Sequence, residues 1–138
     1  MRLFLDANVL FTAAHNPEGR SAAIFQLARG GVCRLVTSPH ALEEAKRNLG
    51  LKYPALVDAL EQLVTLASVE PEAHSTDVGW ALEQGLPPKD APILAAAAHA
   101  RCDVLVTGDR THFGHLYGRR FRGIEVLPPA DALARLLG

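Results

Sequence analysis

The sequence runs KDAPILAAAAHARCDVLVTGD from Lys89 to Asp109, and this stretch decides the fold. Its first half predicts a helix over Ala91–Ala100, with Asp90 placed as the N-cap and a proline in the first turn. Its second half predicts a strand over Asp103–Thr107, because β-branched residues there follow the helix and precede a glycine. A helix that leads into a buried strand is typical of an α/β protein.

The same alternation extends along the rest of the chain. We expect further strands over Arg2–Leu5, Arg34–Thr37, Ala67–Glu70 and Ile124–Leu127. We expect helices over Ser21–Arg29, Pro39–Leu49, Pro54–Leu66, Asp77–Gln84 and Pro129–Leu137, and assign no element between Asp6 and Arg20. Strands separated by helices pair in parallel, with helices on both faces. The sequence therefore predicts one three-layer α/β/α domain with a central parallel sheet over residues 1–138.

Composition excludes several classes of protein. Fourteen Lys and Arg against fifteen Asp and Glu give a net charge of −1, which excludes a broadly basic coat for nucleic acid. A hydrophobic share of 49% excludes a disordered chain. Cys33 and Cys102 have no metal-ligand spacing, so we expect free thiols. No apolar run is long enough for a signal peptide or a membrane span, so we expect a cytoplasmic protein with no membrane partner.

Acidic residues gather where the strands end. Asp6 follows the first strand, and Asp109 follows the strand Asp103–Thr107 after one glycine. Asp90 opens the preceding helix, and the pair Glu43-Glu44 lies on the helix after the second strand. Ligands bind at the carboxyl ends of parallel strands, and clustered carboxylates need a cation to neutralise them. Oxygen ligands select Mg²⁺ or Mn²⁺, and such a site suits phosphodiester hydrolysis.

Each aspartate also has a structural explanation that the sequence leaves open. Asp90 is well placed to cap its helix, Asp6 to form an Asx-turn after the strand, and Asp109 to sit in a turn. The two glutamates differ in their neighbours. Glu43 has Arg47 four residues on, the favoured spacing for a surface ion pair, and this leaves Glu44 as the candidate for the site.

Four segments in this order resemble the PIN-domain nucleases, especially the VapC-like toxins. They are Leu5-Asp-Ala-Asn-Val-Leu10, Ser38-Pro-His-Ala-Leu-Glu-Glu44, Lys89-Asp-Ala-Pro-Ile-Leu-Ala-Ala-Ala-Ala98 and Asp103-Val-Leu-Val-Thr-Gly-Asp109. The match extends over nearly the whole chain. The resemblance implies a PIN-like fold, a metal-dependent endoribonuclease activity, an RNA substrate, a small antitoxin partner and a homodimer.

The resemblance also implies roles for individual residues. Asp6, Glu44, Asp90 and Asp109 would be the catalytic acids and would hold one or two Mg²⁺ or Mn²⁺ ions. Two further residues match polar positions that support the first acid in the family; these are Asn8 and Thr107. Water would be the nucleophile, so no Ser, Cys or His nucleophile is required.

One departure from the family concerns a further acid that some members carry after the fourth one. The region Arg110–Gly114 has His112 there, so we expect a second metal to bind weakly or only with RNA. We expect His112 to be a surface-loop histidine, with metal ligation or a phosphate contact as the alternatives. Cations for RNA are available in Arg110, Arg119, Arg120 and Arg122, and Tyr117 and Phe121 could stack on bases. The alternative is a solvated loop with its aromatic residues in the core.

Two other functions remain as alternatives. A haloacid-dehalogenase-type phosphatase would use Asp6 as its nucleophile, but it needs an Asp two residues later as the general acid, and Asn8 stands there. A non-catalytic binding domain with the same fold would be favoured by the loss of one of the four acids. None of the four is lost.

Overall fold

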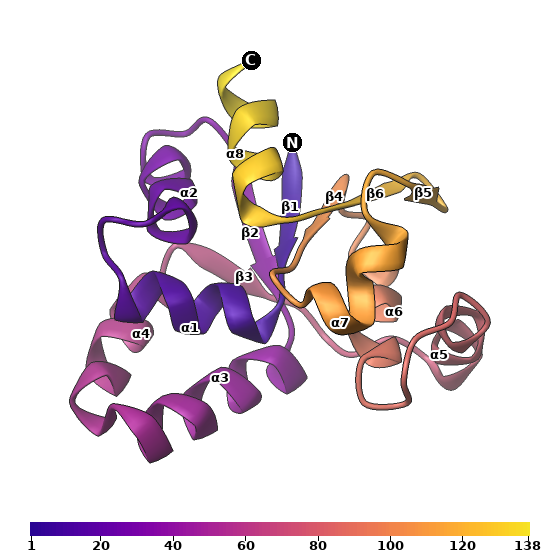
Figure 1. Ribbon diagram of the computed structural model, residues 1–138, viewed down its shortest axis with the longest axis horizontal. Helices are drawn as coiled ribbons and strands as arrows, with labels where there is room; N and C mark the ends of the chain where they lie inside the picture. The colour runs from indigo at the N-terminus through magenta and orange to yellow at the C-terminus, as the bar shows by residue number, and fades with distance from the viewer.

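The computed structural model describes residues 1–138 and has helices and strands in alternation (Figure 1). The strands are β1 (Arg2–Leu5), β2 (Arg34–Thr37), β3 (Ala67–Val69), β4 (Val104–Val106), β5 (Arg120–Phe121) and β6 (Ile124–Leu127). The helices are α1 (Ala7–His15), α2 (Arg20–Arg29), α3 (Pro39–Lys52), α4 (Val57–Val64), α5 (Ser75–Leu82), α6 (Ala91–His99), α7 (Arg110–Phe113) and α8 (Pro129–Leu137), with 3₁₀ turns η1 (Pro54–Leu56) and η2 (Gly114–Leu116).

All strands join one 6-stranded sheet in the order β3-β2-β1-β4-β6-β5. Every neighbouring pair is parallel except β5 and β6, so the predicted central parallel sheet is confirmed, and an antiparallel edge strand that the sequence did not predict is added to it. The two strands are joined by Arg122 and Gly123, whose φ angles are 51° and 82°. Two central residues with positive φ make a tight hairpin turn, and a tight hairpin permits only antiparallel pairing.

Helices cover both faces of the sheet, which confirms the three-layer α/β/α arrangement. Along β1, Leu3 and Leu5 pack into one hydrophobic core and Phe4 packs into the other. The first core is built with α1, α2, α4 and α8, and the second with α5 and α6. Helix α3 contributes to both cores, because Ala41 packs into the second and Ala45 into the first.

Helix α1 fills the segment to which the sequence assigned no element. Asp6 ends β1 and immediately caps the helix, since its Oδ1 accepts a hydrogen bond of 2.7 Å from the Ala7 N–H. Leu10, Ala13 and Ala14 are buried at helical spacing, which is the signal that indicates a helix here. The structural role that the sequence left open for Asp6 is therefore a helix cap and not an Asx-turn, and the chain turns directly from strand to helix.

The strand order places the candidate acids at the centre of the sheet. The chain moves from β1 outward to β2 and β3, and then returns to add β4 on the other side of β1. Ligands of open α/β sheets bind where the order reverses, outside the carboxyl ends of the strands. The two central strands are in register there, with Leu5 paired to Val106, so Asp6 and Thr107 emerge side by side. In Figure 1, α1, α3 and α7 converge at this end of β1.

The structure also describes the two cysteines and the length of the helices. Cys33 and Cys102 are both buried free thiols, as predicted. No helix combines the length and the apolar character that crossing a bilayer requires.

Candidate metal centre

A pocket of about 360 Å³ lies at the carboxyl ends of β1 and β4. All four acids predicted for the site line it: Asp6, Glu44, Asp90 and Asp109. They lie at four different elements: Asp6 follows β1, Glu44 is on α3, Asp90 precedes α6 and Asp109 follows β4. The fold thus brings together four carboxylates that are far apart in the sequence.

Asp6 is the most deeply placed of these acids, with 4% of its surface exposed. Its Oδ2 accepts hydrogen bonds from the hydroxyl of Thr107 at 2.8 Å and from the side-chain amide of Asn8 at 3.1 Å. The pKa of Asp6 is raised to about 6, mainly by burial; the hydrogen bonds from Thr107 and the Ala7 N–H lower it, and the negative charges of Glu44 and Asp90 contribute to the rise. Near neutral pH this carboxylate is therefore one that a nearby cation would stabilise strongly.

Thr107 and Asn8 join the two strand ends. The fully buried Thr107 hydroxyl donates to Asp6 and accepts the Asp109 N–H at 3.2 Å. The side-chain oxygen of Asn8, Oδ1, accepts a hydrogen bond of 2.7 Å from the Gly108 N–H. A Cβ at Gly108 would lie 3.2 Å from this same oxygen, so glycine permits the close approach. The structure thus places both predicted supporting residues between Asp6 and Asp109.

Asp90 stands at the N-cap position of α6 but does not cap the helix. Its side chain makes no capping hydrogen bond, so the structural explanation that the sequence left open is wrong. Its Oδ2 atom is buried and has no hydrogen-bond partner. Burial raises the pKa of Asp90, while His112 and Lys89 lower it. Burying a carboxylate oxygen without a hydrogen-bond partner is unfavourable in free energy. Such an atom in a native site therefore indicates that a ligand binds there.

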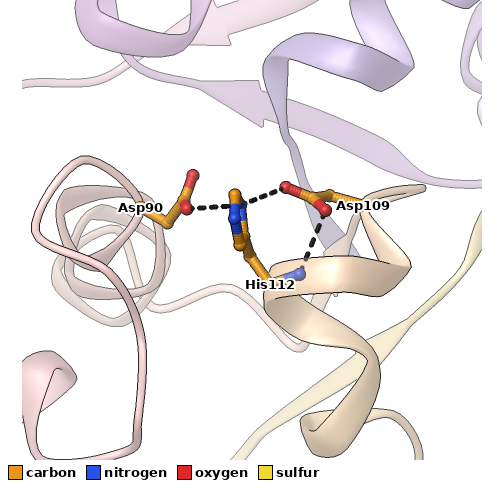
Figure 2. Close-up of side chains that lie close together, drawn as sticks. All are labelled: Asp90, Asp109 and His112. Atoms are coloured by element: carbon orange, nitrogen blue, oxygen red, sulfur yellow. Dashed lines mark hydrogen bonds and ion pairs between the residues drawn. The ribbon is translucent and has the colours of Figure 1, made fainter.

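His112 lies between two of the acids, as Figure 2 shows. Its Nδ1 is 2.9 Å from Oδ2 of Asp90 and 2.9 Å from Oδ2 of Asp109. The hydrogen-bond geometry is satisfied only toward Asp109. The prediction of a surface loop for His112 is wrong: the residue is on α7, and 31% of its side chain is exposed.

The short helix α7 explains this placement. Asp109 caps α7, with its Oδ1 accepting the His112 N–H at 3.1 Å, so the imidazole is turned back toward the carboxylate three residues earlier. The sequence contains a signal for this arrangement, because an N-cap aspartate accepts the N–H of the residue three positions later. Asp109 and His112 have this spacing.

The donor set at this point fits a divalent cation. One atom each from Asp90, Asp109 and His112 lie within 4.8 Å of one another. Two carboxylate oxygens and one imidazole nitrogen are common metal ligands, and the unpartnered oxygen of Asp90 is directed into this group. Asp6 and Glu44 add negative charge on the wall of the same pocket.

The two neighbouring glutamates on α3 separate as their spacing predicts. Glu43 lies 3.9 Å from Arg47 in an exposed ion pair, whereas Glu44 lines the pocket. Asn48 and Lys52 also line the pocket, and neither they nor Lys89 are among the predicted site residues. Positions 44, 48 and 52 recur every four residues on one helix face, which is the pattern that could have indicated them.

The arginines suggested as RNA contacts occupy different places. Arg119, Arg120 and Arg122 do not line the pocket, and each has a partner within the protein. Arg122 lies 2.9 Å from Asp77 and stacks over Trp80, Arg120 lies 3.8 Å from Glu125, and Arg119 stacks over Phe121. These contacts, together with the burial of Phe121 in the second core, favour the alternative of a solvated loop with its aromatic residues in the core. Arg110, beside Asp109, makes no ion pair.

A comparison with models of known protein families matches most of the chain. A family model described as PIN domain matches residues 2–111, which include all four acids. The chain belongs to the PIN domain family. No curated protein sequence matches it.

Solved structures share the PIN fold at low sequence identity. PAE2754 from Pyrobaculum aerophilum aligns with a TM-score of 0.71 and 20% identity, covering 99% of this chain and 96% of that one. A chain of VapBC2 from Rickettsia felis, bound to a DNA fragment from their promoter, aligns with a TM-score of 0.70 and 16% identity, covering 93% and 98%. VapC20 from Mycobacterium tuberculosis, a toxin that cleaves the sarcin-ricin loop, aligns with a TM-score of 0.58 and 17% identity, covering 79% and 91%.

Proposed function

We propose that this PIN-domain protein is a metal-dependent endoribonuclease that hydrolyses RNA phosphodiester bonds at the acidic pocket. The observation that carries the proposal is the buried, unpartnered Oδ2 of Asp90, which faces Asp109 and His112 in a pocket lined by four acids. His112 Nδ1 lies 2.9 Å from this oxygen without hydrogen-bonding it, and a divalent cation held between the carboxylates would stabilise their negative charges.

The cation is Mg²⁺ or Mn²⁺, held by Asp90 and Asp109 with His112 as a nitrogen ligand and with Asp6 and Glu44 on the same wall. When bound, it supplies Lewis-acid polarisation of the phosphate and lowers the pKa of water. An imidazole among the ligands favours Mn²⁺ over Mg²⁺, since Mg²⁺ prefers oxygen ligands.

The residues of the chain have separate tasks in this reaction. Thr107 and Asn8 hold Asp6 in place through their hydrogen bonds. Lys52 and Lys89 line the pocket and offer positive charge to the phosphate backbone of the RNA. Water attacks the phosphorus in line and the bond to the 3′ oxygen breaks, so the products carry a 5′-phosphate and a 3′-hydroxyl.

We further propose that the protein is the toxin of a toxin–antitoxin pair, acts in the cytoplasm and forms a homodimer. Support comes from its structural neighbours, which include VapBC and FitAB toxin–antitoxin complexes. A basic side chain of the antitoxin would reach into the acidic pocket and take the place of the metal charge. Expression of the protein alone should therefore arrest growth of a bacterial host, whereas expression of Asp90→Asn should not. Growth unaffected by an active enzyme would contradict the toxin role.

The test of the nuclease is cleavage of RNA by the purified protein in Mn²⁺, in Mg²⁺ and in EDTA, with sarcin-ricin-loop RNA and single-stranded RNA as substrates. Asp90→Asn and Glu44→Gln should lower the rate about 100-fold or more, because each weakens the charge that holds the metal. Glu43→Gln is the matched control, since the neighbouring glutamate points away from the pocket, and its rate should equal that of the wild type.

The outcomes separate the alternatives. Cleavage that needs metal and is lost in Glu44→Gln but kept in Glu43→Gln supports the proposal. Absence of cleavage in either metal would favour a non-catalytic binding module. Hydrolysis of a phosphomonoester without RNA cleavage would favour the phosphatase, although both polar groups of the Asn8 side chain are already engaged in hydrogen bonds.

A further inference from the structure

A second hollow, of about 470 Å³, adjoins the acidic pocket. Thr12 and Gly108 line both, so the two share a wall. The hollow is built from the end of α1, the starts of α2 and α8, and Arg110 at the start of α7. A polymer that lies across the acidic pocket can therefore continue into this neighbouring space.

Two arginines line the second hollow, and neither is neutralised. Arg20 and Arg110 are exposed and make no ion pair with any carboxylate of the protein. They differ in this respect from Arg120 and Arg122, which lie close to Glu125 and Asp77. Free guanidinium groups in a concave site are suited to bidentate binding of a phosphate.

The start of α2 adds uncapped backbone N–H groups. Its N-cap residue is Gly19, which has no side chain to satisfy the first N–H groups, and no acidic residue stands in the first turn. The first N–H groups of a helix have no partner within the helix and carry partial positive charge. Anions bind readily at such a helix end.

Ser21 provides an independent indication of a ligand. Only 3% of this residue is exposed, it lines the hollow, and its hydroxyl makes no hydrogen bond within the protein. The hydroxyl oxygen is not fully enclosed, because the one such buried side-chain oxygen without a partner is Oδ2 of Asp90, so the Ser21 hydroxyl is open to the hollow. A phosphate oxygen in the hollow would accept this hydrogen bond together with those of the helix N–H groups.

One negative charge opposes this positive potential. The exposed Glu18 also lines the hollow. Its carboxylate repels a phosphate, so its removal has an effect opposite in sign to the removal of either arginine. This residue therefore offers a second, oppositely directed test of the same site.

We propose that this hollow, the phosphate pocket of Arg20, Ser21 and Arg110, binds a backbone phosphate of the RNA next to the phosphate that is cleaved. The proposal rests on the proposed nuclease function, because the shared wall makes the RNA in the acidic pocket the ligand that reaches it. The phosphate pocket fixes the direction and position of the strand over the acids and carries no base specificity of its own.

The experiment measures binding without cleavage. The full-length protein is titrated into a short fluorescein-labelled single-stranded RNA in EDTA, and anisotropy is followed from about 50 mM to 200 mM salt. Arg20→Gln and Arg110→Gln should each weaken binding about five- to tenfold and reduce the slope of log affinity against log salt by roughly 0.7, the value for one lost phosphate contact. Ser21→Ala should weaken binding by a smaller factor, and Glu18→Gln should tighten it.

Arg29→Gln is the matched control. It removes the same charge from the other end of α2, away from both hollows, and should leave affinity and slope unchanged. Thermal unfolding of each variant checks that the fold is retained, as expected for exposed arginines.

The results distinguish failure of the phosphate pocket from failure of the nuclease. If the protein cleaves RNA but Arg20→Gln and Arg110→Gln bind like Arg29→Gln, the phosphate pocket is wrong and the nuclease stands. If the two variants lose binding but even the wild type cleaves no RNA in metal, the nuclease is wrong and the pocket is supported as a phosphate site. Weaker binding by Glu18→Gln would also contradict the pocket.

Discussion

At the scale of single residues, Asp6 would couple the stability of the protein to the proposed metal site. The unfolded chain has an ordinary carboxyl group with a pKa of 3.8, and burial in the folded protein raises that pKa to about 6. The folded state therefore holds its proton at pH values where the unfolded state has already lost it. Ionising Asp6 in the folded protein costs free energy that a cation in the pocket would offset.

We predict that the metal-free protein loses stability as the pH rises from about 4 through about 6. Below pH 3.8 both states are protonated and the contribution of Asp6 is fully present, and above pH 6 it is lost, a change on the order of 3 kcal/mol. Urea unfolding in EDTA across this range measures it. The loss should be smaller in Asp6→Asn and unchanged in Asp58→Asn, a surface control, and Mn²⁺ at pH 7 should restore stability. Parallel pH curves for Asp6→Asn and the wild type would contradict this account.

We predict that His112 sets the metal preference. In His112→Asp the imidazole is replaced by a carboxylate, so the ratio of Mn²⁺ to Mg²⁺ affinity should fall by about tenfold or more. Titration calorimetry with each metal measures the ratio. The control is His115→Asp, because the His115 ring bonds to the Gln84 carbonyl and is not part of the cluster of potential metal ligands, so this variant should keep the wild-type ratio. An unchanged ratio in His112→Asp would show that the imidazole is not a ligand.

We predict that Thr107→Val weakens metal binding as well as folding. The variant loses the hydroxyl that donates to Asp6 and accepts the Asp109 N–H, so it should lose about 1–3 kcal/mol of stability and 10- to 100-fold in Mn²⁺ affinity. Thr37→Val is the matched control: this threonine is equally buried at the end of β2, and its hydroxyl donates to the Leu5 carbonyl. It should lose stability alone. Equal losses of Mn²⁺ affinity in both variants would rule out a specific role for Thr107.

At the scale of elements, the sequence was informative wherever hydrophobic spacing and a cap agreed. Residues Ala91–His99 and Val104–Val106 form the helix and strand that the deciding stretch predicts, and Ser38 caps the predicted helix α3 by accepting the Ala41 N–H. The short α7 and α1 directly after a strand escaped prediction, because one turn of helix has no periodicity and a cap shared with a strand end resembles a turn. His112 was misjudged for this reason, since only α7 turns it toward the acids.

We predict that Arg101→Gly stabilises the protein. Arg101 follows the end of α6 with a φ of 56°, and its N–H and that of Cys102 bond back to Ala98 and Ala97 in a Schellman motif. Glycine adopts this left-handed conformation without the Cβ strain, so the free energy of unfolding should rise by about 1 kcal/mol. Arg101→Ala keeps the Cβ and should show no gain in chemical denaturation. A gain of equal size in alanine would mean that the arginine side chain, and not the backbone, is responsible.

At the scale of the whole molecule, the topology converts separate sequence signals into one site. The four acids could be named from the sequence because each stands at a strand end or on the adjoining helix. The position of Arg20 beside the pocket could not be, because it depends on how α2 packs against α1, which no local pattern encodes.

The net charge of the molecule has a different interpretation once the acidic pocket is known. Four of the fifteen acids line one pocket, so the fourteen Lys and Arg outnumber the acids that remain elsewhere. One divalent cation would offset two of these four negative charges and bring the formal net charge from −1 to about +1. A net charge of −1 is therefore compatible with a nucleic-acid substrate.

The most direct test of the central claim is the chemical identity of the RNA ends that the purified protein produces in Mn²⁺. Hydrolysis by water at the acidic pocket predicts 5′-phosphate and 3′-hydroxyl ends, formed by the wild type and not by Asp90→Asn. Ends carrying a 5′-hydroxyl and a 2′,3′-cyclic phosphate, or equal cleavage by Asp90→Asn, would contradict the account, because the 2′-hydroxyl of the RNA would then be the nucleophile or the acids would be dispensable.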